Sequence, residues 1–270
     1  MPRFIFKLVA TAALSFVTAS AAQAASCGNT ASGFDAWKRE FAAEAQRAGV
    51  GQRGIQALMN AQYSTGTINA DRNQKGVKYA LNDFIRIRLG SVDGFASTAR
   101  KRMNRNPNFY AALEQRYGVP AGILLAIHGM ETGFGRTMGS TPVVSSITTV
   151  AYDCRRSSFF TPHAIAALKM VDRGMLAPSQ KGAFHGELGH TQFLPGNALR
   201  YGVDANGDGR VDFYNEADAL ASTANFLRQK GWRPGQPYGE GTANFRVLNE
   251  WNAATVYQQA IALVAAKIDG

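Results

Sequence analysis

The sequence of 270 residues is short of several patterns, and each shortage excludes a class of protein. Apolar and polar residues seldom alternate, so a mainly helical protein is expected rather than a β-protein. Internal repeats and low-complexity segments are absent. After residue 24 no apolar stretch is long enough to cross a bilayer, so the mature chain is expected to be soluble. The apolar fraction of 46% is that of a globular protein, and the length allows one large domain or two small ones.

The four histidines form no complete metal-binding motif. His185 and Glu187 form an H-x-E pattern, but no P-C-x-x-C follows it, and H-E-x-x-H is absent. We therefore expect no catalytic zinc, and no cofactor that the chemistry requires.

The first residues have the features of a secretory leader. Residues 1–7 are basic, residues 8–17 are apolar but too short to span a membrane, and Ala22-Gln23-Ala24 fits a small-x-small cleavage site. We predict that residues 1–24 are a signal peptide and that the mature protein is periplasmic.

Cysteine is scarce, since Cys27 and Cys154 are the only two. In an oxidising periplasm they could form a disulfide that closes a long loop, worth about 3–5 kcal/mol in the entropic model. Lipid attachment at Cys27 is the alternative, although the leucine usual three residues earlier is Ala24 here.

Acidic residues are also few, with 19 Asp and Glu against 29 Lys and Arg, which gives a formal charge of +10. Loss of Arg3 and Lys7 with the leader subtracts 2 and leaves about +8. Export and the scattered placement of the basic residues argue against nucleic acid. A polyanionic wall polymer with peptide carboxylates accounts for the charge better.

Apolar spacing predicts a series of amphipathic helices. We expect a helix marked by Val77, Leu81 and Phe84, and a loop over 63–74, which is polar and rich in Thr, Asn and Gly. The other expected helices cover 34–48, 55–61, 91–102, 109–117, 121–131, 161–174, 215–231 and 253–267.

Glu131 is the residue around which the chain is organised. Ile123, Leu124 and Ile127 lie on one helical face, and the next position on that face is Glu131. Burial and the negative end of the helix dipole both raise the pKa of a carboxyl group there. Such a residue suits a general acid, as in glycoside cleavage, whereas an ordinary helix-terminal glutamate turned to solvent is the alternative.

Residues 131–136, ETGFGR, resemble the E-T-x-[FW]-G-R signature of the lytic murein transglycosylases of the MltB type, which are lysozyme-like enzymes. Further matches follow in the family's order and at similar spacing from about residue 30 to the C-terminus. They include Cys154-Arg155-Arg156, Lys181-Gly182, GHTQFLPGN at 189–197, Asn225-Phe226, Gly231-Trp232, Asn244-Phe245 and Tyr257-Gln258.

The resemblance implies a fold, an activity and a set of site residues. The fold would be mainly α, with a lysozyme-like catalytic domain, an additional N-terminal helical portion and an EF-hand-like loop. Glu131 alone would protonate the oxygen between MurNAc and GlcNAc, and the sugar's own 6-hydroxyl would then close a 1,6-anhydro ring without water. The substrate-binding residues would be Phe134, Arg155, Arg156, Gln192, Phe193, Trp251, Asn252 and Tyr257.

Two pairs of these residues can also be interpreted from their side-chain chemistry alone. The amide of Gln192 and the ring of Phe193 suit saccharide hydroxyl and ring faces, although the segment could equally be a turn before Pro195. The guanidinium groups of Arg155 and Arg156 suit peptide carboxylates, although a solvated pair is the alternative.

Residues 204–215, DANGDGRVDFYN, have the oxygen spacing of an EF-hand calcium loop. The bidentate Glu expected at position 12 is Asn215 here, so the alternative is a turn that caps the following helix. The possible structural Ca²⁺ ligands are Asp204, Asn206, Asp208, the carbonyl of Arg210, Asp212 and Asn215.

We predict three parts: the leader 1–24, an N-terminal helical portion 25–105 packed on the catalytic domain, and a transglycosylase domain 106–270. The expected partner is the glycan strand of peptidoglycan, bound by a monomer. The rivals are a muramidase with Asp153 or Glu187 opposite Glu131, a cysteine peptidase centred on Cys154, and a non-catalytic wall-binding protein.

Overall fold

The computed structural model describes residues 25–74 and 79–270. The predicted signal peptide over 1–24 and the contribution of Val77 to a helix lie outside the described residues. Over the part of the chain that is described, no helix is both long and apolar enough to cross a membrane.

The described chain is mainly helical, as predicted. A single 3₁₀ turn, Ala31–Gly33, precedes α1, and the short strands β1 (Thr141–Pro142) and β2 (Lys181–Gly182) pair antiparallel. The helices are α1 (Phe34–Arg47), α2 (Gln52–Asn60), α3 (Thr65–Arg72), α4 (Leu81–Leu89), α5 (Val92–Met103), α6 (Pro107–Tyr117), α7 (Ala121–Thr132), α8 (Val143–Tyr152), α9 (Ser157–Asp172), α10 (Pro195–Tyr201), α11 (Glu216–Gln229), α12 (Ala243–Trp251) and α13 (Thr255–Asp269).

The loop predicted over 63–74 is wrong, because residues 65–72 form α3. The Ser64 side chain caps this helix by accepting a hydrogen bond from the Thr67 N–H at 3.2 Å. Thr67, Ile68 and Asp71 are buried, so tertiary packing overrides the low helix propensity of Thr, Asn and Gly.

Helices α8, α10 and α12 were not predicted, and α9 begins at Ser157, before the predicted start at Thr161. Pro162 therefore lies inside α9, where it removes one backbone hydrogen bond. The flanking residues Phe160 and Ala164 are buried in the core, and this packing offsets that loss.

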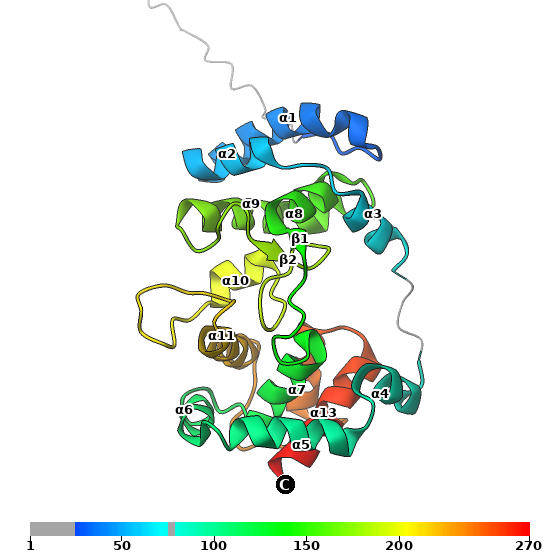
Figure 1. The fold of residues 1–270 in the computed structure, drawn as a ribbon, viewed down its shortest axis with the longest axis vertical. Coiled ribbons are helices and arrows are strands. Elements are labelled where there is room, and N and C mark those ends of the chain that lie inside the picture. Colours follow the sequence, from blue (N-terminus) through cyan, green and yellow to red (C-terminus); the bar gives the residue numbers. More distant parts are fainter. Residues whose placement is uncertain (1–24, 75–78) are drawn as a thin grey trace, which may run out of the picture.

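Two groups of helices lie at opposite ends of the molecule, with α10 and α11 between them (Figure 1). Helices α1, α2 and α3 lie with α8 and α9, whereas α4 and α5 lie with α7 and α13. The segment 25–105 thus contributes to both groups, and the domain boundary at residue 105 stays a prediction.

Helix α7 runs through the core and ends with Glu131 and Thr132, the first two residues of the ETGFGR signature. Every residue of Ala121–Met130 is buried. Gly122 allows close contact with α13, since a Cβ there would lie 2.6 Å from the Ala265 carbonyl oxygen. Asp269 of α13 accepts a hydrogen bond from the Gly122 N–H at 2.8 Å, which fixes the start of α7.

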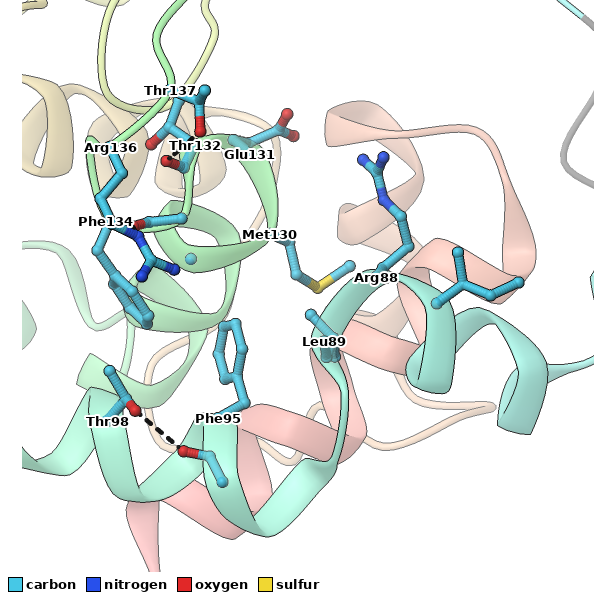
Figure 2. Close-up of a pocket in the computed structure, with 14 residues that line it drawn as sticks. Arg88, Leu89, Phe95, Thr98, Met130, Glu131, Thr132, Phe134, Arg136 and Thr137 are labelled. Atoms are coloured by element: carbon cyan, nitrogen blue, oxygen red, sulfur yellow. Dashed lines mark hydrogen bonds between the residues drawn. The ribbon is translucent and has the colours of Figure 1, made fainter.

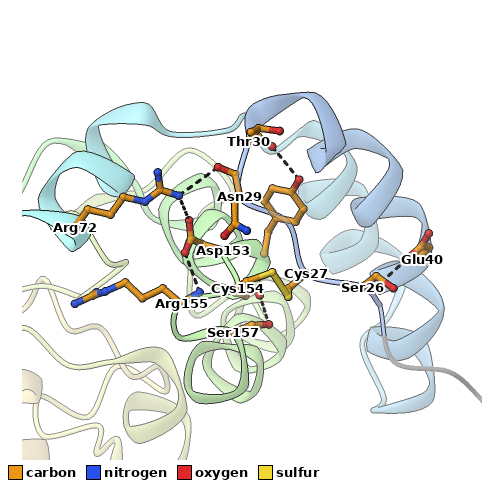
Figure 3. Close-up of a disulfide and its surroundings, with 12 residues drawn as sticks. Ser26, Cys27, Asn29, Thr30, Glu40, Arg72, Asp153, Cys154, Arg155 and Ser157 are labelled. Carbon is orange, nitrogen blue, oxygen red and sulfur yellow. Dashed lines mark hydrogen bonds and ion pairs between the residues drawn. A yellow bond between two sulfur atoms is a disulfide. The ribbon is translucent and has the colours of Figure 1, made fainter.

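The N-terminal residues of the described chain are joined to the end of α8 (Figure 3). Cys27 and Cys154 form a disulfide, which is the predicted pairing. Beside it, the Gly28 N–H donates to the Tyr152 carbonyl at 3.0 Å, and the Cys154 N–H donates to the Gly28 carbonyl at 3.2 Å. Neither sulfur is therefore a free thiol, which argues against a cysteine peptidase centred on Cys154.

Candidate active site

Glu131 lies in the last turn of α7. Gly133 ends the helix in the left-handed backbone conformation, with φ of 59°, which residues with a Cβ rarely adopt. The residues before and after Glu131, Met130 and Thr132, are buried, while Glu131 itself is half-buried. The carboxyl group therefore stands at the edge of the core.

Two aromatic donors hold this carboxyl group. The Tyr257 hydroxyl donates to Glu131 Oε1 at 2.7 Å, and the Trp251 indole N–H donates to the same oxygen at 3.1 Å. They come from α13 and the end of α12, more than a hundred residues away in the sequence. The other oxygen, Oε2, receives no hydrogen bond from a described residue.

The pKa of Glu131 is raised above its ordinary value of 4.5. Burial is the largest cause, because a carboxylate loses hydration there, and the charge of Glu187 acts in the same direction. The hydrogen bonds from Tyr257 and Trp251 and the charge of Arg88 oppose the shift without cancelling it. A raised pKa keeps this group protonated at higher pH than an ordinary glutamate.

Glu131 lines two cavities. The larger, of about 490 Å³, lies between α4, α5 and the end of α7, and its lining includes Arg88, Phe95 and Arg136 (Figure 2). The smaller, of about 90 Å³, also has Gln192 and Trp251 in its lining. A chain of sugars could therefore pass the carboxyl group on both sides.

Gln192 and Phe193 have different positions. Gln192 is half-buried, lines the smaller cavity and has φ of 56°, a strained value for a residue with a Cβ. Its side-chain amide donates to the Gly189 carbonyl at 2.8 Å. Phe193 also lines that cavity, but its ring is buried against Phe213 and Trp251, so most of its face is core.

Phe134 and Asn252 have mainly structural contacts. The Phe134 ring is buried and packs on Phe95, with centroids 5.2 Å apart, although it borders the larger cavity. Asn252 ends α12, and its Oδ1 accepts from the Ala254 N–H at 3.0 Å. The backbone next to Trp251 is thereby fixed.

The arginine pair predicted to face the substrate is bound within the protein. Arg155 and Arg156 both form ion pairs with Asp71 of α3, whose side chain is 2% exposed. Burial would raise the pKa of Asp71, but the two guanidinium groups outweigh it and lower this pKa. The structure therefore gives the pair a partner that sequence reasoning missed, and nothing in the local sequence indicated it.

Neither candidate for a second carboxylate lines a cavity with Glu131. Asp153 is buried and forms an ion pair with Arg72 at 2.7 Å (Figure 3). Burial disfavours the Glu187 carboxylate, but the hydrogen bond and charge of His185 outweigh this and lower its pKa. A carboxylate held in this way is a poor base for a water molecule.

A histidine pair links α7 to the segment that carries Gln192. His128 Nε2 lies 2.9 Å from His190 Nδ1, and burial lowers the pKa of His128 to about 3. Glu216 lies close enough for the three to bind a metal ion, but Arg102, 3.5 Å from Glu216, disfavours a cation. We read the pair as a structural contact.

The loop 204–215 folds around its own side chains. The Asp204 carboxylate accepts from the N–H groups of Gly207 and Gly209 at 2.7 and 2.8 Å, and Asp208 Oδ1 accepts from the Arg210 N–H at 2.9 Å. Asn215 instead caps α11, because its Oδ1 accepts from Ala217 N–H at 2.9 Å. The Asn215 side chain, at position 12 of the calcium spacing, is thus engaged as the cap of α11.

Comparisons with known proteins identify the family of the chain. The family model described as "Transglycosylase SLT domain" matches residues 33–242. "Membrane-bound lytic murein transglycosylase B" of Escherichia coli (strain K12) is 36% identical over 123 residues, which are 45% of this chain and 34% of that protein. The chain therefore spans about a third of the length of that relative.

Two solved structures have a similar fold. SltB3 from Pseudomonas aeruginosa, in complex with NAG-anhNAM-pentapeptide, has a TM-score of 0.79 and 26% identity, covering 88% of this chain and 80% of that one. Slt35 from Escherichia coli, in complex with calcium, has a TM-score of 0.76 and 21% identity, covering 90% and 96%.

Proposed function

The chain belongs to the transglycosylase SLT domain family, and we propose that it is a lytic murein transglycosylase that cuts peptidoglycan with Glu131 as its only acid and base. The observation that carries this proposal is the Glu131 carboxyl group, which is half-buried and lines two cavities. Its raised pKa keeps it protonated at higher pH than an ordinary glutamate. The glycan would lie across both cavities.

In the first step the protonated Glu131 gives its proton to the oxygen between MurNAc and GlcNAc, and the bond from that oxygen to the MurNAc anomeric carbon breaks. The electron pair stays with the leaving GlcNAc. The Tyr257 and Trp251 donors then stabilise the carboxylate that Glu131 becomes.

In the second step the Glu131 carboxylate accepts the proton of the MurNAc 6-hydroxyl, and the oxygen bonds to the anomeric carbon. The product has a 1,6-anhydro ring, and Glu131 is protonated again. Because the nucleophile belongs to the substrate, no water needs to be bound or activated.

A muramidase that uses water needs a second carboxylate opposite Glu131. Asp153 and Glu187 are engaged with Arg72 and His185 and line neither cavity, which favours the transglycosylase. The Gln192 amide and the Trp251 indole would contact sugars in the smaller cavity, with Asn252 fixing the backbone there. Phe134 and Phe193 would border the sugars through ring edges.

Product analysis of purified sacculi tests the function. The wild-type chain should release muropeptides that are lighter by one water than reducing ends, whereas Glu131→Gln should release almost none. Reducing ends in place of anhydro ends would establish the muramidase. Binding to sacculi without release by the wild type would establish the non-catalytic alternative.

We also propose that the protein acts in the periplasm, after removal of residues 1–24. The disulfide supports this, because such bonds persist in oxidising compartments. N-terminal sequencing of the exported protein should start near Ala25.

The loop 204–215 is proposed to hold a structural calcium ion. Asp204, Asn206, Asp208 and Asp212 supply side-chain oxygens and Arg210 a carbonyl, a set that fits Ca²⁺ with water in place of position 12. Millimolar CaCl₂ should raise the melting temperature of the wild type but not of Asp208→Asn. An equal response of both variants would overturn the assignment.

A further inference from the structure

Gln192 lies in a short loop, residues 188–193, whose first and last residues are joined by backbone hydrogen bonds of 2.9 and 3.1 Å. Its φ of 56° is one that a residue with a Cβ seldom adopts, and such a conformation persists only where surrounding contacts hold it. The N–H and the side-chain amide of Gln192 both donate to the Gly189 carbonyl, within the loop itself. The hydrogen bonds that fix the loop to the rest of the protein therefore come from its other residues.

His190 supplies most of these hydrogen bonds. Its N–H donates to the Phe213 carbonyl at 3.0 Å, and its own carbonyl accepts from the Thr132 hydroxyl at 2.7 Å. Its ring nitrogen Nδ1 lies 2.9 Å from Nε2 of His128, which is fully buried in α7. His190 thus joins the loop both to the helix that carries Glu131 and to the segment that precedes α11.

The two imidazole rings favour one arrangement of protons. Burial lowers the pKa of both His128 and His190, so both rings are neutral, and one ring nitrogen donates to the other. Nδ1 of His128 is buried and has no hydrogen-bond partner among the described residues. A buried N–H without an acceptor is rarer in proteins than a buried acceptor without a donor, which assigns the His128 proton to Nε2. His128 is therefore the donor, and Nδ1 of His190 is the acceptor.

The His190 ring also has little room to take another position. A Cβ at Gly135, in the turn that follows Glu131, would overlap Cε1 of this ring. The ring thus packs closely on that turn, while the backbone of His190 belongs to the loop that carries Gln192. A shift at His190 would move Gln192, which lies two residues further along the chain.

We propose that His190, held by His128, is a positioning residue of the enzyme, which keeps Gln192 in its strained conformation so that its amide meets a sugar in the smaller cavity. Neither histidine lines the two cavities beside Glu131, so both act through Gln192 and take no part in the chemistry. This rests on the proposed function, which supplies the sugar substrate.

A double-mutant cycle on bare glycan strands tests the proposal. The variants are His190→Ala, Gln192→Ala and the two combined, and the measurement is kcat/KM for the release of anhydro products. Each single change should lower kcat/KM about tenfold, the effect of one lost hydrogen bond. If His190 acts through Gln192, the combined variant should also lose only about tenfold, whereas independent effects would multiply to about a hundredfold.

Ser222→Ala is the matched control for the loss of a buried hydrogen bond. The Ser222 hydroxyl is buried and accepts from the Val203 N–H at 2.9 Å, and Ser222 lines neither cavity beside Glu131. This change should leave kcat/KM within about twofold, both alone and combined with Gln192→Ala. Urea unfolding of every variant shows that each is folded at the temperature of the assay.

Two further substitutions at His190 test the hydrogen bond itself. His190→Asn offers a side-chain oxygen that can accept from His128 in place of Nδ1, so it should recover activity to within about threefold of the wild type. His190→Phe keeps a ring but offers no acceptor, so it should behave as His190→Ala does and takes its place in the cycle if that variant does not fold. Effects of His190 and Gln192 that multiply, or a His190→Asn variant no more active than His190→Phe, overturn the proposal.

The products of the wild type separate this proposal from the function on which it rests. Anhydro products together with effects that multiply would overturn only the role of His190. If the wild type forms no anhydro products, the transglycosylase is overturned, and the same cycle is then measured as affinity for bare glycan strands by calorimetry. Losses of affinity that do not add would still support the positioning role, and losses that add would overturn it.

Discussion

Replacing Glu131 with Gln tests the central residue by stability as well as by activity. Glutamine keeps the shape of the side chain, and its carbonyl oxygen can accept from Tyr257 and Trp251 as Glu131 Oε1 does. What it removes is the proton and the charge. The variant should therefore lose activity and become more stable at neutral pH.

The expected gain in stability follows from the raised pKa of Glu131. The neutral form is favoured in the folded state, so this carboxyl group stabilises the fold at pH values below its ordinary pKa of 4.5. That stabilisation is lost as the pH rises through the pKa of the folded state. Each unit of raised pKa corresponds to about 1.4 kcal/mol at high pH. We expect Glu131→Gln to gain about 0.5–2 kcal/mol at pH 7 and almost nothing below pH 4.5.

The assay is urea unfolding of the two proteins between about pH 4 and 8, with unfolding free energies taken by linear extrapolation. Glu240→Gln is the control, because Glu240 is exposed, accepts hydrogen bonds from Gln259 and lies outside both cavities beside Glu131. Its unfolding free energy should stay within about 0.5 kcal/mol of the wild type at every pH. In parallel, release of muropeptides should fall at least about 10³-fold in Glu131→Gln.

Two results would refute the reasoning. A Glu131→Gln variant that is less stable at pH 7 would mean that the folded protein favours the carboxylate. A gain in stability that does not depend on pH would mean that it comes from packing and not from the charge.

Three further predictions concern the surroundings of Glu131 and the N-terminal helices. Tyr257→Phe removes a donor that favours the carboxylate, so the alkaline limb of the pH profile should move to higher pH and kcat should fall about tenfold; an unmoved limb would contradict this. Cys27→Ser should lower the unfolding free energy by about 2–5 kcal/mol, and a reductant should have no further effect on that variant. Asp71→Asn should cost about 1–3 kcal/mol, since the arginines that lose their partner are 41% and 32% exposed and partly hydrated; an unchanged urea midpoint would show that the pairs contribute nothing.

Much of the helical framework follows from local pattern. The apolar spacing of α1, α7 and α13 is regular, and these helices lie close to their predicted ranges. Asn215 was predicted to cap a helix, and it does cap α11. By contrast, α3 is rich in Thr, Asn and Gly, and only the burial of Ile68 and Asp71 against other helices makes it helical.

The structure gives the contacts that the predicted substrate-binding residues make within the protein, and their contacts with substrate stay a prediction. The resemblance implied that Trp251 and Tyr257 bind substrate, which stays a prediction, and the structure adds that both donate hydrogen bonds to Glu131. The Phe193 ring is mostly core, and Arg155 and Arg156 are held by Asp71. A sequence motif shows which residue types are present, but it does not show which partner takes each charge.

The sequence alone determined that the chain is helical, where its acid lies and that the acid ends a helix, because these depend on spacing within one segment. Only the tertiary structure decided which groups surround that acid. Tyr257 and Trp251 donate hydrogen bonds to it from helices far away along the chain, and Arg88 lines the same cavity. The burial that raises its pKa exists only once those helices are packed.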